Sequence, residues 1–269
     1  MSEKLSLDGW VFEEIEWLVS DHIMTLTLNR PEVRNAMNAA MINELIYCLD
    51  YAKQTGNIRV VVIAAKGQVF CAGADLKMLS GVQEATRSTL PNQGDLTAIS
   101  LRIRDLHKPV IVKAQGAVLA GALLLVCNAT HVIAATTARF SAPEIKRGIW
   151  PFMVMASLFR VMPKRAGLDF IMRGRDINAE QALSWGLISE AVAAEELNMK
   201  VMALAQELAS LAPRTMQAGL AAYYHQENQS LDEALPDLQK MLSETLNSAD
   251  AKEGIAAFLQ KRSPQWDDQ

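Results

Sequence analysis

The sequence predicts an α/β fold built around a parallel sheet that is covered on both faces. Three short segments are apolar almost throughout, which is typical of strands buried on two sides: Val60–Ala65, Val110–Ala114 and His131–Ala135. Stretches with apolar residues at helical spacing separate them. Because strands and helices alternate, parallel pairing with helical crossovers is expected. The chain has 269 residues, of which 50% are hydrophobic, and is long enough to bury a sizeable core.

The first elements expected are a β-hairpin and a helix. Trp17–Val19 and Ile23–Asn29 nearly alternate between apolar and polar residues, and Ser20–His22 separates them as a turn. Asn38 can cap a helix that runs to about Ala52. The apolar residues of this segment have helical spacing: Met41, Ile42, Leu45, Ile46 and Leu49.

Two further segments complete the expected organisation. The longest apolar run, Ala117–Cys127, is too short to cross a bilayer and is expected to form a buried helix. Beyond about Met199 strand signals fade and long helical periodicity follows, as in Leu204, Leu208, Leu211, Leu238, Met241, Leu242 and Leu246. We therefore expect a core over residues 1–198 and a helical region over residues 199–269.

Charge and cysteine usage exclude several classes of protein. A net charge of −4 argues against a nucleic-acid-binding surface. Cys48, Cys71 and Cys127 lack metal-ligand spacing, so free thiols in a reducing compartment are expected, with no metal site. The acidic N-terminal residues contain no apolar segment of a secretory signal. A cytoplasmic protein that does not bind membranes is the resulting expectation.

Two glycine-bearing segments predict a site that works through backbone amides. Gln68–Lys77 places a glycine turn and exposed N–H groups directly after a buried strand, and Gly116–Gly121 follows later in the chain. Two converging N–H groups can hold the negative charge that develops on a thioester oxygen when the neighbouring carbon becomes an enolate. Taken alone, either segment is better explained by small residues that allow close packing of strand, turn and helix. Neither supplies a nucleophile, so side chains would be needed only to move protons.

Five segments follow one another in the order found in one known family: Leu28–Asn38, Phe70–Lys77, Lys108–Gly116, Phe140–Gly148 and Gly174–Ile188. From about residue 10 to about residue 260 the chain resembles the crotonase superfamily, the enoyl-CoA hydratase/isomerase group. The resemblance implies the crotonase-like (ClpP/crotonase) spiral of ββα units, with a C-terminal helical region for oligomerisation. It also implies an acyl-CoA substrate, no cofactor beyond the coenzyme A of that substrate, and a homotrimer or hexamer.

The same resemblance assigns roles to individual residues. Ala74 and Gly121 match the positions whose N–H groups form the oxyanion hole, and Glu144 matches a carboxylate that exchanges a proton with the substrate carbon. Four residues match regions that surround the adenine and phosphates of coenzyme A: Arg34, Ala72, Leu76 and Lys77. Exposed Lys and Arg residues also serve solubility alone.

Leu124 departs from the hydratase pattern. Hydratases carry a second glutamate at this position, three residues after the oxyanion glycine, and leucine can neither accept a proton nor hydrogen-bond a water. An apolar neighbour also raises the pKa of Glu144, which suits a group that takes and returns a proton. A single-glutamate enoyl-CoA isomerase is therefore the best fit. An enoyl-CoA hydratase and a catalytically weakened acyl-CoA-binding protein are the alternatives, and the acidic balance disfavours an RNA-binding role.

A second departure follows the glutamate. Where many members of the superfamily have a glycine-rich stretch, this chain has the bulky segment Trp150–Ser157. Its side chains either reshape the acyl pocket or pack into the core, and the sequence does not distinguish the two. The acyl chain of the substrate therefore stays open.

Overall fold

A six-stranded sheet forms the centre of the computed structural model, which describes residues 5–82 and 85–267. The strand order is β1-β2-β3-β4-β6-β9, and every pair after the antiparallel β1–β2 hairpin is parallel. The strands are β1 (Ile15–Ser20), β2 (Ile23–Leu28), β3 (Val60–Ala65), β4 (Val110–Ala114), β6 (His131–Ala135) and β9 (Glu190–Val192). The expected hairpin and the three expected buried strands are thus confirmed.

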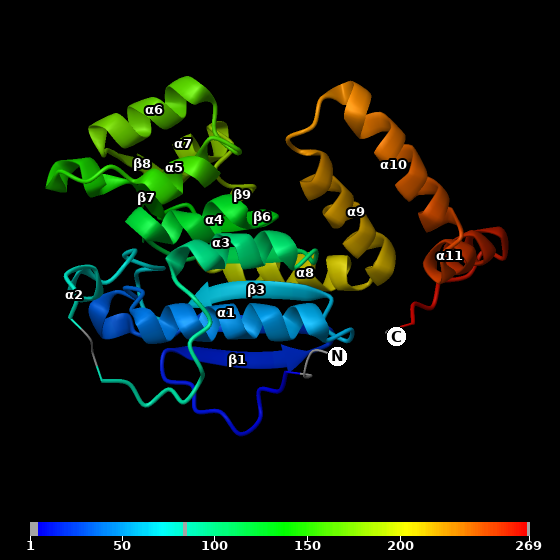
Figure 1. Ribbon diagram of the computed structural model, residues 1–269, viewed down its shortest axis with the longest axis horizontal. Coiled ribbons are helices and arrows are strands. Elements are labelled where there is room, and N and C mark those ends of the chain that lie inside the picture. The colour runs from blue at the N-terminus through cyan, green and yellow to red at the C-terminus, as the bar shows by residue number, and fades with distance from the viewer. Residues whose placement is uncertain (1–4, 83–84, 268–269) are drawn as a thin grey trace.

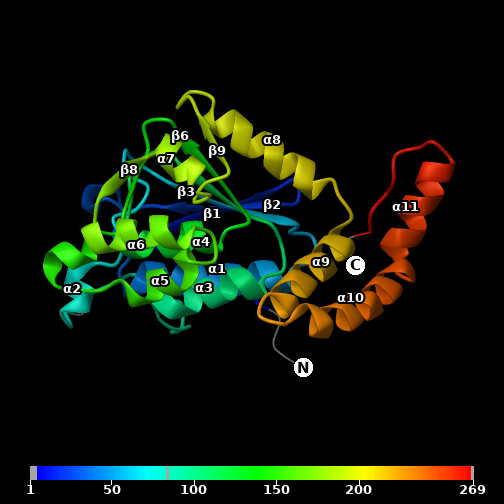
Figure 2. The same ribbon diagram turned by 90° about the horizontal axis from the view of Figure 1, so that it is seen from above.

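Helices cover both faces of this sheet, as Figure 2 shows. On one face lie α1 (Ala39–Gln54), α3 (Leu96–Asp105) and α4 (Leu123–Asn128), and on the other lies α8 (Leu197–Ala209). In β3, Val61 and Ile63 pack with the first group, whereas Val60 and Val62 pack with α8. Because successive side chains of a strand point to opposite faces, a strand between two helical layers must be apolar at every position.

The start of α1 follows from its N-cap. The Asn38 side chain accepts a hydrogen bond from the Met41 amide at 2.9 Å, which satisfies one of the unpaired donors of the first turn. The expected helix is confirmed, and it ends two residues later than predicted, at Gln54. Its apolar stripe faces the sheet, where Met41, Leu45 and Ile46 are fully buried.

The expected helix over Ala117–Cys127 is wrong in its first part. Val118 and Leu119 form β5, which pairs with β7 (Arg139–Ser141), and α4 begins only at Leu123 after the 3₁₀ turn Ala120–Ala122. Ala120 has a φ of +53°, which breaks helical continuity at that residue. An apolar run alone does not distinguish a buried strand from a buried helix. Here pairing with β7 makes its first part a strand.

A second, three-stranded sheet carries the turns of the candidate site. Its order is β5-β7-β8, with β8 (Asp176–Asn178) antiparallel to β7. An isolated bridge between Cys71 and Val118 ties the first glycine turn to it. Short helices and 3₁₀ turns complete the part of the chain before α8. They are η1 (Pro31–Val33), α2 (Leu76–Leu79), η2 (Ala120–Ala122), η3 (Pro143–Arg147), α5 (Phe152–Leu158), α6 (Lys164–Arg173) and α7 (Ala179–Ser184).

The last three helices project from one side of the molecule (Figure 1). They are α9 (Pro213–Gln226), α10 (Leu231–Leu246) and α11 (Ala249–Leu259), and they pack mainly on one another. The boundary predicted after residue 198 stays a prediction; residue 198 lies inside α8, a helix that packs on the sheet. Among the described residues, no helix combines the length and apolarity that crossing a membrane requires.

Candidate active site

All seven residues selected from the sequence line one cavity of about 620 Å³. The cavity lies between the two glycine turns, η3 and the start of α5. The lining residues among those selected are Arg34, Ala72, Ala74, Leu76, Lys77, Gly121 and Glu144. The chain thus brings together residues from four separate sequence segments.

The backbone around Ala74 is held so that its N–H group faces away from η1 and α1. The amide of Met37 donates to the carbonyl of Gly73 at 2.8 Å, and the amide of Asp75 donates to the carbonyl of Met37 at 2.9 Å. The Gly73 carbonyl and the Ala74 N–H belong to one planar trans peptide group, so they point in opposite directions. The Ala74 N–H is therefore directed to the side opposite Met37, where the cavity lies.

Gly121 leaves that amide uncovered. A Cβ atom built on Gly121 would lie 3.3 Å from the backbone nitrogen of Ala74 and 3.3 Å from Leu96 Cδ2. Conversely, a Cβ atom on Gly73, whose φ is +93°, would lie 2.9 Å from the nitrogen of Gly121. Gly121 also lies in the first turn of the helical segment that continues into α4, where N–H groups have no partner within the helix. Two backbone donors are thus close together at one wall of the cavity.

Glu144 supplies the carboxyl group of this site. It lies in η3, directly after β7, as the sequence predicts. Its Oε2 atom is buried and has no hydrogen-bond partner among the described residues. Burial raises the pKa of Glu144, although a backbone hydrogen bond within the residue and the charge of Arg147 oppose the shift. A carboxyl group in this environment is suited to taking up and releasing a proton.

The second acidic residue of the described cavity lining, Asp75, is already engaged. It forms an ion pair with Arg30, between Nη1 and Oδ2 at 3.0 Å, and caps α2 by accepting from the Lys77 amide at 2.9 Å. Burial opposes ionisation of Asp75, yet the hydrogen bonds from Arg30 and Lys77 hold its pKa below the usual value. Leu124, which is 2% exposed, also lines the cavity, at the position where the resemblance to hydratases leads one to expect a second glutamate.

The bulky segment after Glu144 contributes to both the cavity and the core. Trp150, Phe152 and Met153 line the cavity, and Phe152 is 69% exposed at its mouth. Trp150 Nε1 contacts Met155 Sδ at 3.3 Å, which holds the indole in place. Val154 and Ser157 of the same segment are buried, at 3% and 7% exposed, and Val154 packs in the core. The segment therefore contributes both to the cavity and to the core, and its effect on an acyl chain stays a prediction.

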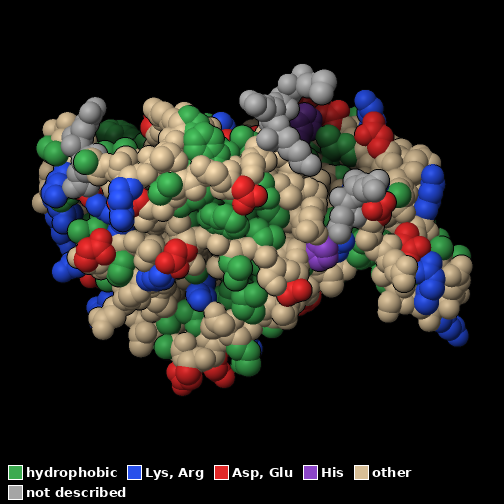
Figure 3. All heavy atoms as spheres, turned by 90° about the horizontal axis from the view of Figure 1, so that it is seen from below, with side chains coloured by type: hydrophobic (Ala, Val, Ile, Leu, Met, Phe, Trp, Pro, Cys, Tyr) green, Lys and Arg blue, Asp and Glu red, His purple; other side chains and the backbone are tan. Residues whose placement is uncertain are grey.

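Basic side chains surround the other wall. Arg34 follows η1 in a left-handed conformation, and its carbonyl accepts a hydrogen bond from the Ala72 amide at 3.0 Å. Lys77 lies on α2, whose end of the molecule carries a concentration of Lys and Arg side chains on the face drawn in Figure 3. Arg30 and Arg147 also line the cavity. Sequence reasoning gave no role to either, although Arg30 lies within the Leu28–Asn38 motif.

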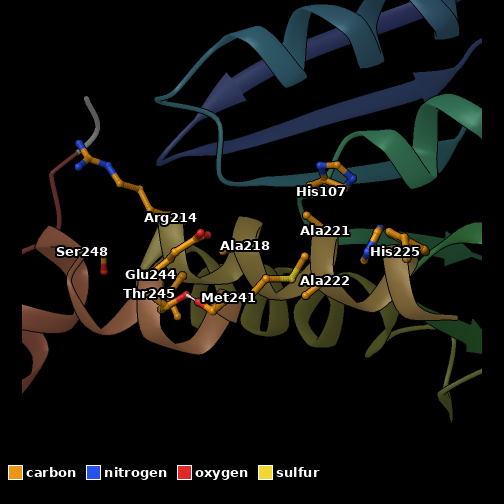
Figure 4. A pocket seen from close by; sticks show the side chains of 12 residues that line it. His107, Arg214, Ala218, Ala221, Ala222, His225, Met241, Glu244, Thr245 and Ser248 are labelled. Atoms are coloured by element: carbon orange, nitrogen blue, oxygen red, sulfur yellow. Dashed lines mark hydrogen bonds between the residues drawn. The ribbon is translucent and has the colours of Figure 1, made fainter. Parts of the chain in front are cut away.

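A second cavity, of about 730 Å³, lies between α9 and α10 next to His107 (Figure 4). Small side chains such as Ala218 and Ala222 line much of it, and its carboxylate, Glu244, is exposed. The His107 ring stacks on Tyr224 with centroids 6.3 Å apart. None of the residues selected for catalysis borders this larger cavity. The chemistry is therefore assigned to the smaller one.

Relatives in sequence point to one family. A sequence profile described as enoyl-CoA hydratase/isomerase matches residues 19–269. A Bacillus subtilis protein named as a probable enoyl-CoA hydratase is 34% identical over 256 residues, which is 94% of this chain and 98% of that protein. The mitochondrial enoyl-CoA hydratase domain-containing protein 3 of Rattus norvegicus is 30% identical over 246 residues, which is 91% of this chain and 82% of that protein.

Solved structures agree with the sequence comparison. The human enoyl-CoA hydratase domain-containing protein 3 superposes with a TM-score of 0.86 at 29% identity and covers 94% of this chain and 100% of its own. The Mycobacterium smegmatis enoyl-CoA hydratase gives a TM-score of 0.86 at 27% identity, with 94% and 99% covered. The fold is that of the crotonases. The chain belongs to the enoyl-CoA hydratase/isomerase family.

Proposed function

We propose that this protein is a single-glutamate enoyl-CoA isomerase that moves a double bond between the 3- and 2-positions of an acyl-CoA thioester. One observation carries the proposal. Of the two acidic residues that line the described cavity, Asp75 is held by Arg30, and only Glu144 has an unbonded carboxyl oxygen. At the position where a second glutamate would stand beside Glu144, the chain has the buried side chain of Leu124.

The proposed reaction needs one base and one oxyanion site. Ionised Glu144 removes a proton from carbon 2 of a 3-enoyl thioester, and the electron pair of the broken C–H bond delocalises onto the thioester oxygen. The N–H groups of Ala74 and Gly121 hold this oxygen. The same proton then returns from Glu144 to carbon 4, which gives the 2-enoyl thioester. No water and no second base enter the balance.

The rest of the cavity fits a coenzyme A thioester. Arg34 and Lys77 would contact phosphates, and the backbone and side chains around Ala72 and Leu76 would contact the adenine. The apolar wall beyond Glu144, which includes Trp150, suits an acyl chain. Coenzyme A would enter as part of the substrate, without a further cofactor.

Hydration is the second candidate, and the names of the relatives favour it. Several of them are named as probable enoyl-CoA hydratases, including the Bacillus subtilis protein. In this cavity, however, the attacking water would be held by Glu144 without a second carboxylate. We expect slow hydration for this reason, because two groups normally share the positioning and activation of the water.

Product analysis separates these candidates. Purified protein is incubated with 2-enoyl- and 3-enoyl-CoA substrates of several chain lengths, and products are identified by chromatography and mass. Isomerisation leaves the mass unchanged, whereas hydration adds one water. Conversion of 3-enoyl- to 2-enoyl-CoA that Glu144→Gln abolishes is the expected result. Hydration without isomerisation would favour the second candidate, and binding without turnover would favour the weakened acyl-CoA-binding protein.

Assembly and location are separate proposals. Several large apolar side chains of α10 and α11 are exposed, including Leu242, Leu246 and Phe258, the last at 82%, which supports a trimer or hexamer formed through these helices. Light scattering that reports a monomer at micromolar concentration would contradict it. The cytoplasmic location stays a prediction, because the rat relative is named as mitochondrial. Fractionation of cells with an antibody against the protein tests it.

A further inference from the structure

We propose that Arg30 is a positioning residue that orients and polarises the Ala74 N–H group through two consecutive peptide groups. The inference rests on the proposed function, because it assumes that this N–H group receives the thioester oxygen. Arg30 belongs to the Leu28–Asn38 motif, in which only Arg34 otherwise has a proposed role.

The guanidinium group of Arg30 is buried and held on three sides. Nη1 donates to the carbonyl of Ala36 at 2.7 Å and to Asp75 Oδ2 at 3.0 Å, and Nε lies 3.2 Å from Glu14 Oε2. The side chains of Arg30, Asp75 and Glu14 are only 11%, 11% and 10% exposed. Solvent therefore screens the charge of Arg30 only weakly.

Two peptide groups connect this charge to the cavity. The Ala36 carbonyl, which accepts from Arg30, shares a planar peptide group with the Met37 N–H. That N–H donates to the Gly73 carbonyl at 2.8 Å, and this carbonyl shares its peptide group with the Ala74 N–H. A chain of hydrogen bonds thus runs from the guanidinium group, through two peptides, to the donor at the cavity wall.

Such a chain makes its last donor stronger. A cation at the first carbonyl polarises that peptide, which makes the Met37 N–H more acidic, and the effect passes to the next peptide in the same sense. The ion pair with Asp75 adds an anchor on the other side of Ala74, since the Asp75 amide is fixed to the Met37 carbonyl at 2.9 Å. In this proposal Arg30 acts on the thioester oxygen through the Ala74 amide.

Vibrational spectroscopy of a bound thioester tests this directly. The probe is a saturated acyl-CoA, of the chain length that binds most tightly, labelled with carbon-13 at the thioester carbonyl. In the wild type the carbonyl stretch should move to lower frequency on binding, because the N–H donors polarise the bond. In Arg30→Met the band should return part of the way toward its value in water. The isomerisation kcat should fall by roughly ten- to a hundredfold, less than the loss of a whole donor, while KM changes by about threefold or less.

Three further variants separate this role from a structural one. Arg30→Lys keeps the charge and donates from a single nitrogen, so it should restore part of the frequency shift and remains informative if Arg30→Met does not fold. Asp75→Asn should move the frequency less than Arg30→Met, since the route through Ala36 stays intact. Arg102→Met removes an ion pair, Arg102 Nε to Asp50 Oδ1 at 2.8 Å, that does not border the cavity. It should lower stability without moving the band.

The outcomes distinguish this inference from the function on which it rests. A wild-type protein that binds the labelled thioester without any shift of the band would overturn the proposed oxyanion site, and the role of Arg30 with it. A full wild-type shift that Arg30→Met and Arg30→Lys both retain would overturn the inference alone. Equal shifts of the carbonyl band in Arg30→Met and Arg102→Met would also overturn the inference.

Discussion

The backbone nitrogen of Ala74 lies 3.3 Å from the point at which a side chain on Gly121 would begin. Two turns that are far apart in the sequence therefore approach so closely that only a glycine at one of them leaves the amide of the other accessible. This relationship links a packing requirement to the proposed chemistry, and it can be tested by adding a single methyl group.

We expect Gly121→Ala to lower the isomerisation rate by at least about tenfold, because the methyl group would cover the Ala74 N–H and losing one such donor costs about 10²–10³-fold. The two contacts of 3.3 Å that the added Cβ would make require its neighbours to shift slightly, so the fold should be retained at a small cost in stability. The φ of Gly121 is not in the left-handed region, so alanine meets no backbone strain there. Gly219→Ala is the matched control, since no atom lies within 4 Å of its added Cβ. That control should keep full activity and gain roughly 0.5–1 kcal/mol of helix stability. Equal rates in the two variants would contradict the prediction.

Glu144→Gln should remove most activity and leave coenzyme A affinity largely unchanged. The substitution keeps the shape of the side chain and deletes proton transfer, which typically contributes about 10²–10⁴-fold. Turnover and calorimetric titration with coenzyme A measure the two effects. The variant should also be more stable than the wild type at neutral pH, since it removes a negative charge that burial disfavours. A folded Glu144→Gln protein with normal turnover would refute the assigned role.

The pH dependence of isomerisation should report the same residue. Burial raises the pKa of Glu144, and the reaction needs its ionised form. The value of kcat/KM should therefore rise with pH through a midpoint above about 4.3, the usual pKa of a glutamate. The contribution of Glu144 to the free energy of unfolding should change in the opposite direction. Its pKa is higher in the folded state, so it stabilises the fold at low pH, and this contribution is lost as pH rises through that pKa. A midpoint at or below the usual value would contradict the assigned environment.

Leu124→Glu should give the protein the ability to hydrate a 2-enoyl-CoA. It restores a carboxyl group close to Glu144, and two neighbouring carboxyl groups share one proton near neutral pH, which provides an acid and a base together. Formation of 3-hydroxyacyl-CoA is the measurement, and Leu124→Gln is the control that adds polarity without a charge. The substitution also places a charge at a buried position, which should lower the stability of the fold. A folded variant that binds coenzyme A but does not hydrate would mean that Trp150 and its neighbours, rather than Leu124, determine the reaction.

Stability should fall between about pH 9 and pH 10, because three buried thiols resist ionisation in the folded state. Burial raises the pKa of Cys71 and of Cys127 to about 12, and that of Cys48 upward as well. The unfolded chain therefore holds fewer protons than the folded one in this range. Lys108 acts in the opposite direction, since burial lowers its pKa to about 8. Burial also lowers the pKa of Lys113, which acts in the same direction as Lys108, and it raises the pKa of Tyr224, which adds to the loss. Three thiols against two amines still leave a net loss, on the order of 1–2 kcal/mol per pH unit.

Urea unfolding with a reducing agent at several pH values measures this loss. Cys127→Ala should flatten the decline, because it removes one of the protons that the folded state retains. A free energy of unfolding that does not change between pH 9 and pH 10 would show that the thiols ionise without unfolding.

The elements that the sequence predicts well are those fixed by local pattern. Asn38 caps α1 as expected because the cap depends on residues within three positions. Strand β3 follows from its unbroken apolar character. The error at Val118 arises because β5 depends on pairing with Phe140, a contact distant in sequence. Arg30 was given no role for the same reason: its partner Asp75 lies 45 residues away, and nothing local reveals the pairing.

The two donors at the cavity wall are main-chain groups, and this has a consequence for how the family can diversify. A side-chain donor is lost whenever its residue changes, but the Ala74 N–H survives any substitution at position 74 that preserves the turn. The side chain there is free to vary in size while the amide stays where Met37 and Gly73 hold it. Mutation at this position can thus change the cavity wall without first abandoning the amide that we propose stabilises the enolate.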